Sequence, residues 1–204
     1  LSMRAFLYDA LLTFGDTYKV GELYVLNPHF FIDIDKAGFD EKELAKAVKV
    51  SGVDPDNVIK KWIDGRLEIS FAEKLKHNAS YTVSMDEVKD SEGYSIASFT
   101  SFTFQTLPYI KAGLVSMQNP EELVATNTNL LVQFDYDITW GNAPMNDKLV
   151  ISCEGNPNVT YVASYSNKLL SIIPSPCFNY DTKYTLNIGT FTNDITGQEV
   201  TPAS

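Results

Sequence analysis

The side chains best suited to acid–base chemistry are the two histidines, His29 and His77, and the 26 aspartates and glutamates. Both histidines lie in the first half of a chain whose two halves resemble each other, and the second half has none. A catalytic pair built into a duplicated architecture would not be distributed in this way. The Gly-x-Ser-x-Gly, phosphate-binding glycine-loop and His-Glu-x-x-His motifs are also missing. The sequence therefore predicts no catalytic residues and no enzyme.

Three pairs of aspartates stand two positions apart, a spacing at which two carboxylates can share one calcium ion. The pairs are Asp33 with Asp35, Asp54 with Asp56, and Asp135 with Asp137. The calcium loop with Asp, Asn and Gly at fixed intervals and a closing Glu is absent. Solvated acidic faces are the more common use of such pairs, so we predict no bound metal and no cofactor.

Two tryptophans, Trp62 and Trp140, stand close to the turn sequences Asp64-Gly65 and Gly141-Asn142. An exposed tryptophan at such a place can stack on a sugar ring or on the surface of a partner protein. Packing into a core is the alternative, and it is the more frequent use of the residue. The two tryptophans are therefore candidates for a ligand-binding platform, and packing into the core is the alternative.

The chain's two cysteines, Cys153 and Cys177, are too few for a scaffold built on disulfides and lack the paired spacing of a zinc site. Whether they pair with each other stays open. The net charge of −10 and the pI near 4.6 argue against nucleic acid as a partner, because binding phosphates requires clustered basic residues. No apolar run is long enough to span a membrane.

An internal repeat divides the chain into two similar halves. Residues 30–35 correspond to residues 130–135 at an offset of 100, and residues 67–69 correspond to residues 170–172 at an offset of 103. The offset changes only where loops are expected, as in a duplicated domain whose surface connections have drifted. The repeat predicts two domains, at residues 1–106 and 107–204.

The sequence of each half predicts about seven short strands separated by turn-rich stretches, which is the pattern of a β-sandwich or β-barrel. Tyr81, Val83 and Met85 alternate with polar residues, which predicts a strand with one buried face. Helical patterning is confined to residues 40–48, where Asp40 is placed as an N-cap with Glu43 as its capping-box partner. The predicted fold class is all-β, with two tandem β-sandwich domains.

Both halves carry an apolar residue, then a tyrosine six positions later, then an Asp-x-x-Gly turn. These residues are Leu75, Tyr81, Asp90 and Gly93 in the first half, and Phe178, Tyr184, Asp194 and Gly197 in the second. The pattern resembles that of the bacterial Ig-like domains of S-layer and other cell-surface proteins. The family commonly has Asn after the glycine, whereas this chain has Tyr94 and Gln198. The resemblance implies immunoglobulin-like sandwiches in a secreted or surface-exposed protein.

The tyrosines and glycines also have a structural role that follows from their chemistry. A tyrosine at a corner between strands can bury its ring while its hydroxyl binds a nearby backbone group, and we expect this of Tyr81 and Tyr184. A glycine can take the positive φ of a tight turn, and an aspartate three positions earlier can bind the turn backbone. We expect Gly93 and Gly197 to close such turns.

Taken with the resemblance, the sequence predicts a non-catalytic module that acts as a spacer or adhesion element of a secreted or cell-surface bacterial protein. One alternative is a binding module for carbohydrate or for a cell-surface protein. Another is the N-terminal portion of a larger surface enzyme or macroglobulin-like protein.

Overall fold

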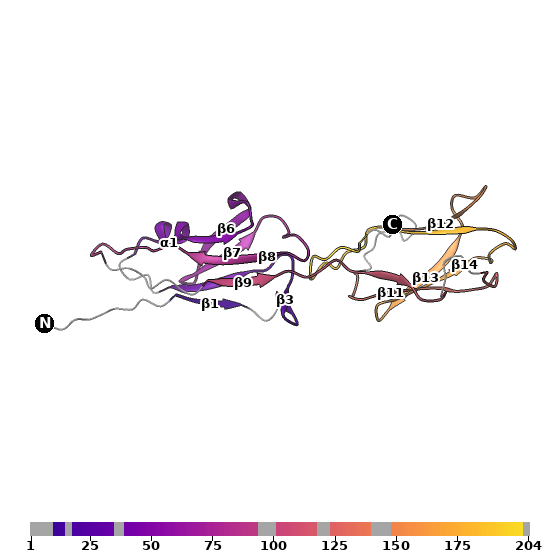
Figure 1. The fold of residues 1–204 in the computed structure, drawn as a ribbon, viewed down its shortest axis with the longest axis horizontal. Coiled ribbons are helices and arrows are strands. Elements are labelled where there is room, and N and C mark those ends of the chain that lie inside the picture. The colour runs from indigo at the N-terminus through magenta and orange to yellow at the C-terminus, as the bar shows by residue number, and fades with distance from the viewer. Residues whose placement is uncertain are drawn as a thin grey trace. The chain divides into compact units, whose positions relative to one another are not determined.

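A computed structural model describes residues 10–14, 18–34, 39–93, 101–117, 123–139 and 148–201 of the 204-residue chain. Strands dominate these residues, which confirms the predicted all-β fold class (Figure 1). The chain divides into two compact units, Leu1–Pro108 (unit 1) and Tyr109–Ser204 (unit 2). The division falls close to the predicted boundary between residues 106 and 107.

Unit 1 contains a four-stranded sheet in the order β1-β4-β7-β6 and a three-stranded sheet in the order β5-β8-β9. The strands of the first sheet are β1 (Ala10–Phe14), β4 (Phe30–Ile34), β7 (Arg66–Phe71) and β6 (Val58–Ile63). Those of the second are β5 (Val48–Ser51), β8 (Ser80–Met85) and β9 (Phe102–Gln105), and a short ribbon is formed by β2 (Lys19–Val20) and β3 (Leu23–Tyr24).

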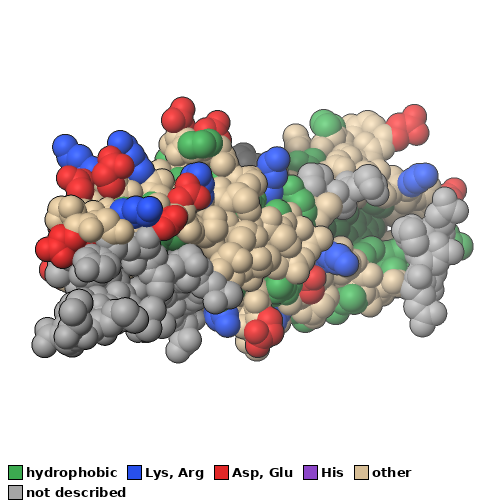
Figure 2. All heavy atoms as spheres, turned by 60° about the vertical axis from the view of Figure 1, so that its left-hand side comes forward, with side chains coloured by type: hydrophobic (Ala, Val, Ile, Leu, Met, Phe, Trp, Pro, Cys, Tyr) green, Lys and Arg blue, Asp and Glu red, His purple; other side chains and the backbone are tan. Residues whose placement is uncertain are grey.

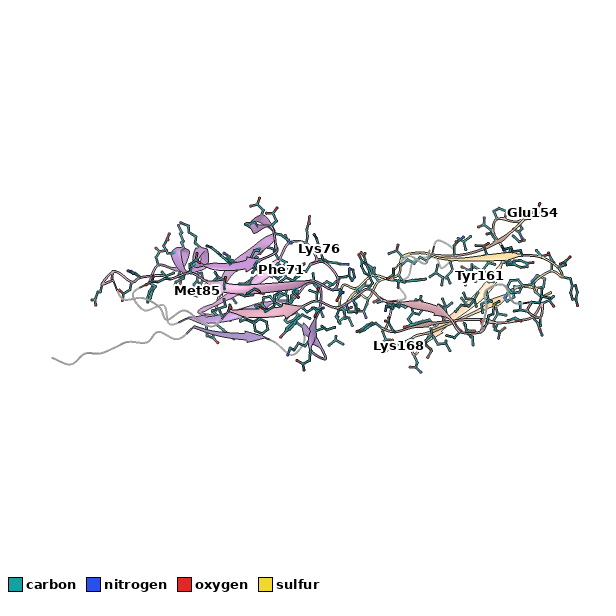
Figure 3. The ribbon with its side chains drawn as sticks, in the orientation of Figure 1. Phe71, Lys76, Met85, Glu154, Tyr161 and Lys168 are labelled. Carbon is teal, nitrogen blue, oxygen red and sulfur yellow. The ribbon has the colours of Figure 1, made fainter. Side chains whose placement is uncertain are left out.

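The core of unit 1 lies between these two sheets, because alternate residues of β7, β5 and β8 point inward. In β8, Tyr81, Val83 and Met85 are buried, as the alternation in the sequence predicted. Aromatic rings fill the centre, where the ring centroids of Phe30 and Phe104 are 4.9 Å apart in an edge-on contact. Figure 3 marks Met85 and Phe71, which belong to β8 and β7.

Unit 2 has the same plan. Its four-stranded sheet has the order β10-β11-β14-β13, and β12 pairs with β15 in the second sheet. The strands are β10 (Ala112–Leu114), β11 (Leu130–Phe134), β14 (Leu169–Pro174), β13 (Tyr161–Ser166), β12 (Leu149–Cys153) and β15 (Tyr184–Ile188). Residues of both sheets pack into one core cluster, so this unit too is a sandwich.

The two units also share the register of their strand pairs. In unit 1, Ile32 of β4 lies opposite Leu67 of β7, and in unit 2, Val132 of β11 lies opposite Leu170 of β14. These four positions are related by the sequence offsets of 100 and 103. Since a slip by one residue would turn every side chain to the other face of the sheet, the shared register gives both cores the same set of inward positions.

The helix α1 (Glu41–Ala47) forms where the sequence predicted it, and Asp40 is its N-cap. The Asp40 carboxylate accepts hydrogen bonds from the backbone N–H groups of Lys42 (2.8 Å) and Glu43 (3.2 Å). The Glu43 carboxylate accepts from the Lys46 ammonium at 2.9 Å. The helix buries Leu44 and Ala47 and leads directly into the edge strand β5.

Candidate functional site

The two predicted corner tyrosines make matching contacts in the two units. The Tyr81 hydroxyl accepts a hydrogen bond from the backbone N–H of Lys76 at 3.0 Å, and that of Tyr184 accepts one from the N–H of Asn179 at 2.8 Å. Each bond reaches back five residues, and Tyr81 is only 4% exposed. Both tyrosines therefore hold the loop that enters their own strand, which is a structural role.

The first of the two predicted glycine turns has the expected geometry. The Asp90 carboxylate accepts from the N–H of Glu92 at 2.9 Å, and the Gly93 N–H donates to the Asp90 carbonyl at 3.0 Å. Gly93 has φ of +86°, a value that strains residues bearing a Cβ.

The second turn is built differently from the expectation. Gly197, with φ of +74°, donates its N–H to the carbonyl of Asn193 at 2.8 Å. The side-chain oxygen of Asn193 accepts from the N–H groups of Ile195 (2.9 Å) and Thr196 (3.1 Å). The Asp194 carboxylate accepts from the Thr192 hydroxyl instead, at 3.2 Å. The turn is one residue longer in unit 2, so the capping role moves from the aspartate to the preceding asparagine.

Trp62 is a half-buried residue of the edge strand β6 and packs against the core of unit 1. Its indole N–H donates to the Glu41 carbonyl at 3.1 Å. The packing against the core and this bond fix the ring, so the geometry favours the structural alternative for Trp62. Trp140 lies outside the described residues.

The remaining polar candidates have local partners. Arg66 binds both carboxylate oxygens of Asp33, at 2.6 and 3.3 Å, and His29 Nδ1 lies 2.6 Å from Glu68. No group of three or more metal-ligating side chains occurs in the part of the chain that the structure describes. Cys153 and Cys177 are free thiols.

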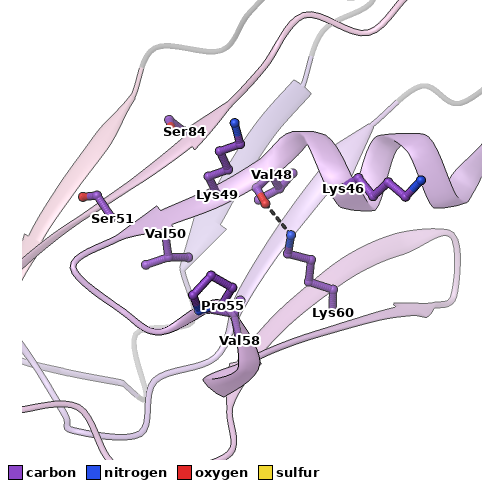
Figure 4. A pocket seen from close by; sticks show the side chains of 9 residues that line it. All are labelled: Lys46, Val48, Lys49, Val50, Ser51, Pro55, Val58, Lys60 and Ser84. Atoms are coloured by element: carbon purple, nitrogen blue, oxygen red, sulfur yellow. Dashed lines mark hydrogen bonds between the residues drawn. The ribbon is translucent and has the colours of Figure 1, made fainter.

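One concave feature among the described residues is a groove of about 450 Å³ along one side of unit 1 (Figure 4). It runs between β5 and β6, which are the edge strands of the two different sheets. Four apolar residues and three lysines contribute most of its lining, namely Val48, Val50, Pro55, Val58, Lys46, Lys49 and Lys60. We refer to this feature as the edge groove.

Lys60 crosses the edge groove from β6 to β5. Its ammonium donates to the carbonyl oxygen of Ala45 at 2.8 Å and to that of Val48, the bond drawn in Figure 4. Burial lowers the pKa of Lys60, and the positive charge of Lys49 lowers it further. Lys49 forms an ion pair with Asp86. The edge groove therefore holds a partly desolvated cation whose ammonium is bonded to backbone carbonyls.

In unit 2, a tyrosine connects the corresponding edge strands, β13 and β12. The Tyr161 hydroxyl, at the start of β13, donates to the carbonyl of Leu149 at 2.8 Å. Leu149 is the first residue of β12, just as Val48 is the first residue of β5. Figure 3 marks Tyr161 in unit 2. Both units therefore join their two edge strands through a side chain, but only the one in unit 1 carries a positive charge.

The sequence interpretation did not identify the edge groove, although one signal was available. Lys60 stands two residues from both Val58 and Trp62, so all three share one face of β6, and that face packs toward the core. A lysine at an inward position of a strand indicates a buried polar contact or a binding site.

The surface in Figure 2 shows basic and acidic side chains close to one another. Within the described residues, no helix has the length and apolar character needed to cross a membrane.

The sequence model of one family, described as a bacterial Ig-like domain, matches residues 114–204. The match covers most of unit 2 and a single copy of the domain. It agrees with the resemblance drawn from Phe178, Tyr184 and Gly197. No curated protein sequence matches the chain.

Two solved structures show only distant similarity. An L,D-transpeptidase from Mycobacterium smegmatis is 7% identical, with 90% of this chain and 75% of that chain covered and a TM-score of 0.38. A titin structure, described as the anomalous substructure of Titin-A168169, is 13% identical, with 96% and 100% covered and a TM-score of 0.25. At these TM-scores neither structure informs the fold or the function.

Proposed function

We propose that this chain is a non-catalytic tandem module of a secreted or cell-surface bacterial protein, in which it acts as a spacer or adhesion element. The observation that carries the proposal is the plan that the two units share in their four-stranded sheets and in the pairs β5–β8 and β12–β15. Their sheets share strand order and register, and their corner tyrosines make the same bond. Because unit 2 matches a bacterial Ig-like family, the shared plan supports unit 1 as a second, diverged copy.

The polar residues that the sequence singled out support a structural role. Tyr81, Tyr184, Asp90 and Gly93 hold loops, and Trp62 binds a backbone carbonyl. These contacts stabilise the sandwiches. They do not support a sugar-stacking site at Trp62.

The surface location can be tested in the bacterium that encodes the chain. Antibodies against this chain should label intact cells or the culture medium, and protease added to intact cells should remove the label. Labelling that appears only after lysis would contradict a surface role.

Spacer and adhesion roles can be separated by replacement within the full-length gene product. A spacer should be replaceable by two unrelated β-sandwich domains without loss of function, because only the separation of its neighbours matters. An adhesion element should not be replaceable, and cells with the replacement should lose attachment. Turnover of a substrate that one point substitution abolishes would contradict both.

A further inference from the structure

We propose that strand β15 of unit 2 pairs with one further strand, antiparallel to it, and that the same polypeptide supplies this strand after residue 204 of the full-length gene product. In unit 1, β9 takes the equivalent place beside β8. The inference concerns how unit 2 is completed, so it does not depend on whether the chain is a spacer or an adhesion element.

The second sheets of the two units differ by one strand. In unit 1 this sheet has the order β5-β8-β9, whereas the described residues of unit 2 form only the pair β12-β15. The strands β8 and β15 correspond, because the corner tyrosines Tyr81 and Tyr184 stand near the start of each and make the same bond. Within the described part of unit 2, β15 therefore has a neighbouring strand on one side only.

The backbone of β15 is oriented for pairing on its other side. Gly189 donates its N–H to the Lys148 carbonyl, so these two residues form a hydrogen-bonded pair next to the ladder of β12 and β15. Bonded and non-bonded pairs alternate along an antiparallel ladder, which directs the N–H and C=O groups of Tyr184, Leu186 and Ile188 away from β12. None of the described residues bonds these groups. Their counterparts in β8 face β9.

The apolar face of β15 is incompletely covered. Tyr184, Leu186 and Ile188 pack against the core of unit 2 but are only half-buried. The three corresponding residues of β8 are buried. In unit 1, the ring of Phe104 in β9 lies beside that of Tyr81, with 5.5 Å between the centroids. A strand that brings an aromatic side chain to the same place in unit 2 would remove apolar surface from water.

A second exposed apolar place borders the same side of unit 2. In unit 1, Tyr24 is 4% exposed, and its carbonyl accepts from the N–H of Leu107, which follows β9. The residue 100 positions further along is Val124, which is 39% exposed, and the preceding Leu123 is 96% exposed. The segment that covers Tyr24 in unit 1 therefore has no counterpart among the described residues of unit 2.

A threonine that follows β9 holds the loop before β8. The fully buried Thr106 hydroxyl donates to the Lys76 carbonyl at 2.6 Å and accepts from the Ala79 N–H at 3.0 Å. The loop before β15 has the same bend, since Asp181 has φ of +49° and Asn78 has φ of +51°. No described residue takes the place of Thr106 there. The further strand should therefore carry a threonine two residues after its aromatic residue.

The position of β9 in the chain indicates the source of the further strand. Phe102, the first residue of β9, stands nine residues after Gly93 of the glycine turn. The same count from Gly197 leads to the second residue after Ser204. The repeat thus favours the same polypeptide over a strand from another protein. The residues there should alternate as in β9, with apolar or aromatic residues at every second place.

The test adds a fluorescent peptide with the sequence of residues 101–107, which include β9, to the 204-residue chain. Anisotropy should show saturable binding, and a peptide of the same composition in scrambled order should not bind. Methyl NMR signals of Leu186 and Ile188 should shift. Those of Val83 should stay in place, because β9 already pairs with this part of β8.

Methylated peptides test the strand pairing directly. In unit 1, the N–H groups of Phe102 and Phe104 point toward β8, as that of Thr106 does when it bonds the Ala79 carbonyl. Methylating the two phenylalanine nitrogens should therefore abolish binding. Methylating the nitrogens of the residues that follow each phenylalanine should leave the peptide active, because those N–H groups point away from the paired strand.

Neighbouring residues of β15 give a matched pair of variants. Leu186→Ala should weaken peptide binding about fivefold or more, because apolar contact with the added strand is lost. Asn187→Ala changes an exposed side chain on the opposite face of β15 and should change binding less than about twofold. The methylated peptides require no variant of the chain, so they decide the question even if Leu186→Ala unfolds unit 2.

A longer chain that carries the next residues of the gene product tests the source of the strand. Its own strand should occupy the edge of β15, so the peptide should no longer bind. Peptide binding that persists in the longer chain would overturn the inference, because the strand would then come from elsewhere. Absence of saturable binding to the 204-residue chain up to about 1 mM peptide, or equal binding of the two methylated forms, would also overturn it.

Discussion

At the scale of single residues, the corner tyrosines are the positions whose role is easiest to test. Tyr81→Phe keeps the ring and removes the acceptor of the Lys76 N–H, which should lower the stability of unit 1 by about 1 kcal/mol. Tyr184→Phe should cost unit 2 less, because its bond lies nearer to solvent. Urea unfolding followed by methyl NMR resolves the two units. A loss in the wrong unit, or no loss from Tyr81→Phe, would contradict the assignment.

Alkaline pH provides a second test at this scale. Burial raises the pKa of the Tyr161 hydroxyl above its usual value of about 10. The unfolded chain then loses this proton at a lower pH than the folded chain does. The stabilisation is fully present below about pH 10 and is lost as the pH rises through the folded-state value.

Tyr161→Phe should therefore flatten the fall in stability of unit 2 above about pH 10, relative to the unsubstituted chain. Urea midpoints of unit 2 methyl signals, measured from about pH 8 to pH 11, would show the difference. Tyr180→Phe is the control, because Tyr180 is 87% exposed. Equal pH dependence in the Tyr161→Phe chain and the unsubstituted chain would contradict a raised pKa of Tyr161 in the folded chain.

At the scale of elements, the helix α1 depends on its cap. Asp40→Ala leaves the N–H groups of Lys42 and Glu43 without this acceptor and should destabilise unit 1 by about 1 kcal/mol. Asp40→Asn keeps an acceptor at the same place and should cost less. Thermal or urea unfolding of the three proteins tests the order. A larger loss from Asn than from Ala would contradict the capping role.

Element-scale features also show where sequence reasoning succeeded. The offsets of 100 and 103 relate positions of β4 to β11 and of β7 to β14 that have the same register, because inward positions of a sandwich must stay apolar. Asp40 could be predicted as a helix N-cap because an N-cap side chain binds backbone N–H groups only two or three residues further along the chain. Such features are local or periodic, and a single sequence records them.

The edge groove could not be predicted in the same way. It exists because β5 and β6, from different sheets, lie side by side and because Pro55–Asn57 turns inward on itself. Both facts depend on tertiary packing. The shift of the turn cap from Asp194 to Asn193 was missed for a similar reason, since one extra residue in a turn changes which side chain reaches the backbone.

At the scale of the whole molecule, the account rests on two separately folded sandwiches with equivalent interiors. Leu67 and Leu170 are both fully buried and occupy matching places opposite Ile32 and Val132. Truncating either to alanine should cost its own unit about 2–5 kcal/mol, since it leaves a cavity in a close-packed core.

The most direct measurement is urea unfolding of Leu67→Ala and Leu170→Ala, followed by methyl NMR signals from both units. We predict that Leu67→Ala lowers the midpoint of unit 1 signals alone and that Leu170→Ala lowers the midpoint of unit 2 signals alone, by similar free energies. A single transition that both substitutions shift for every signal would contradict the account, because it would show one cooperative core in place of two equivalent ones.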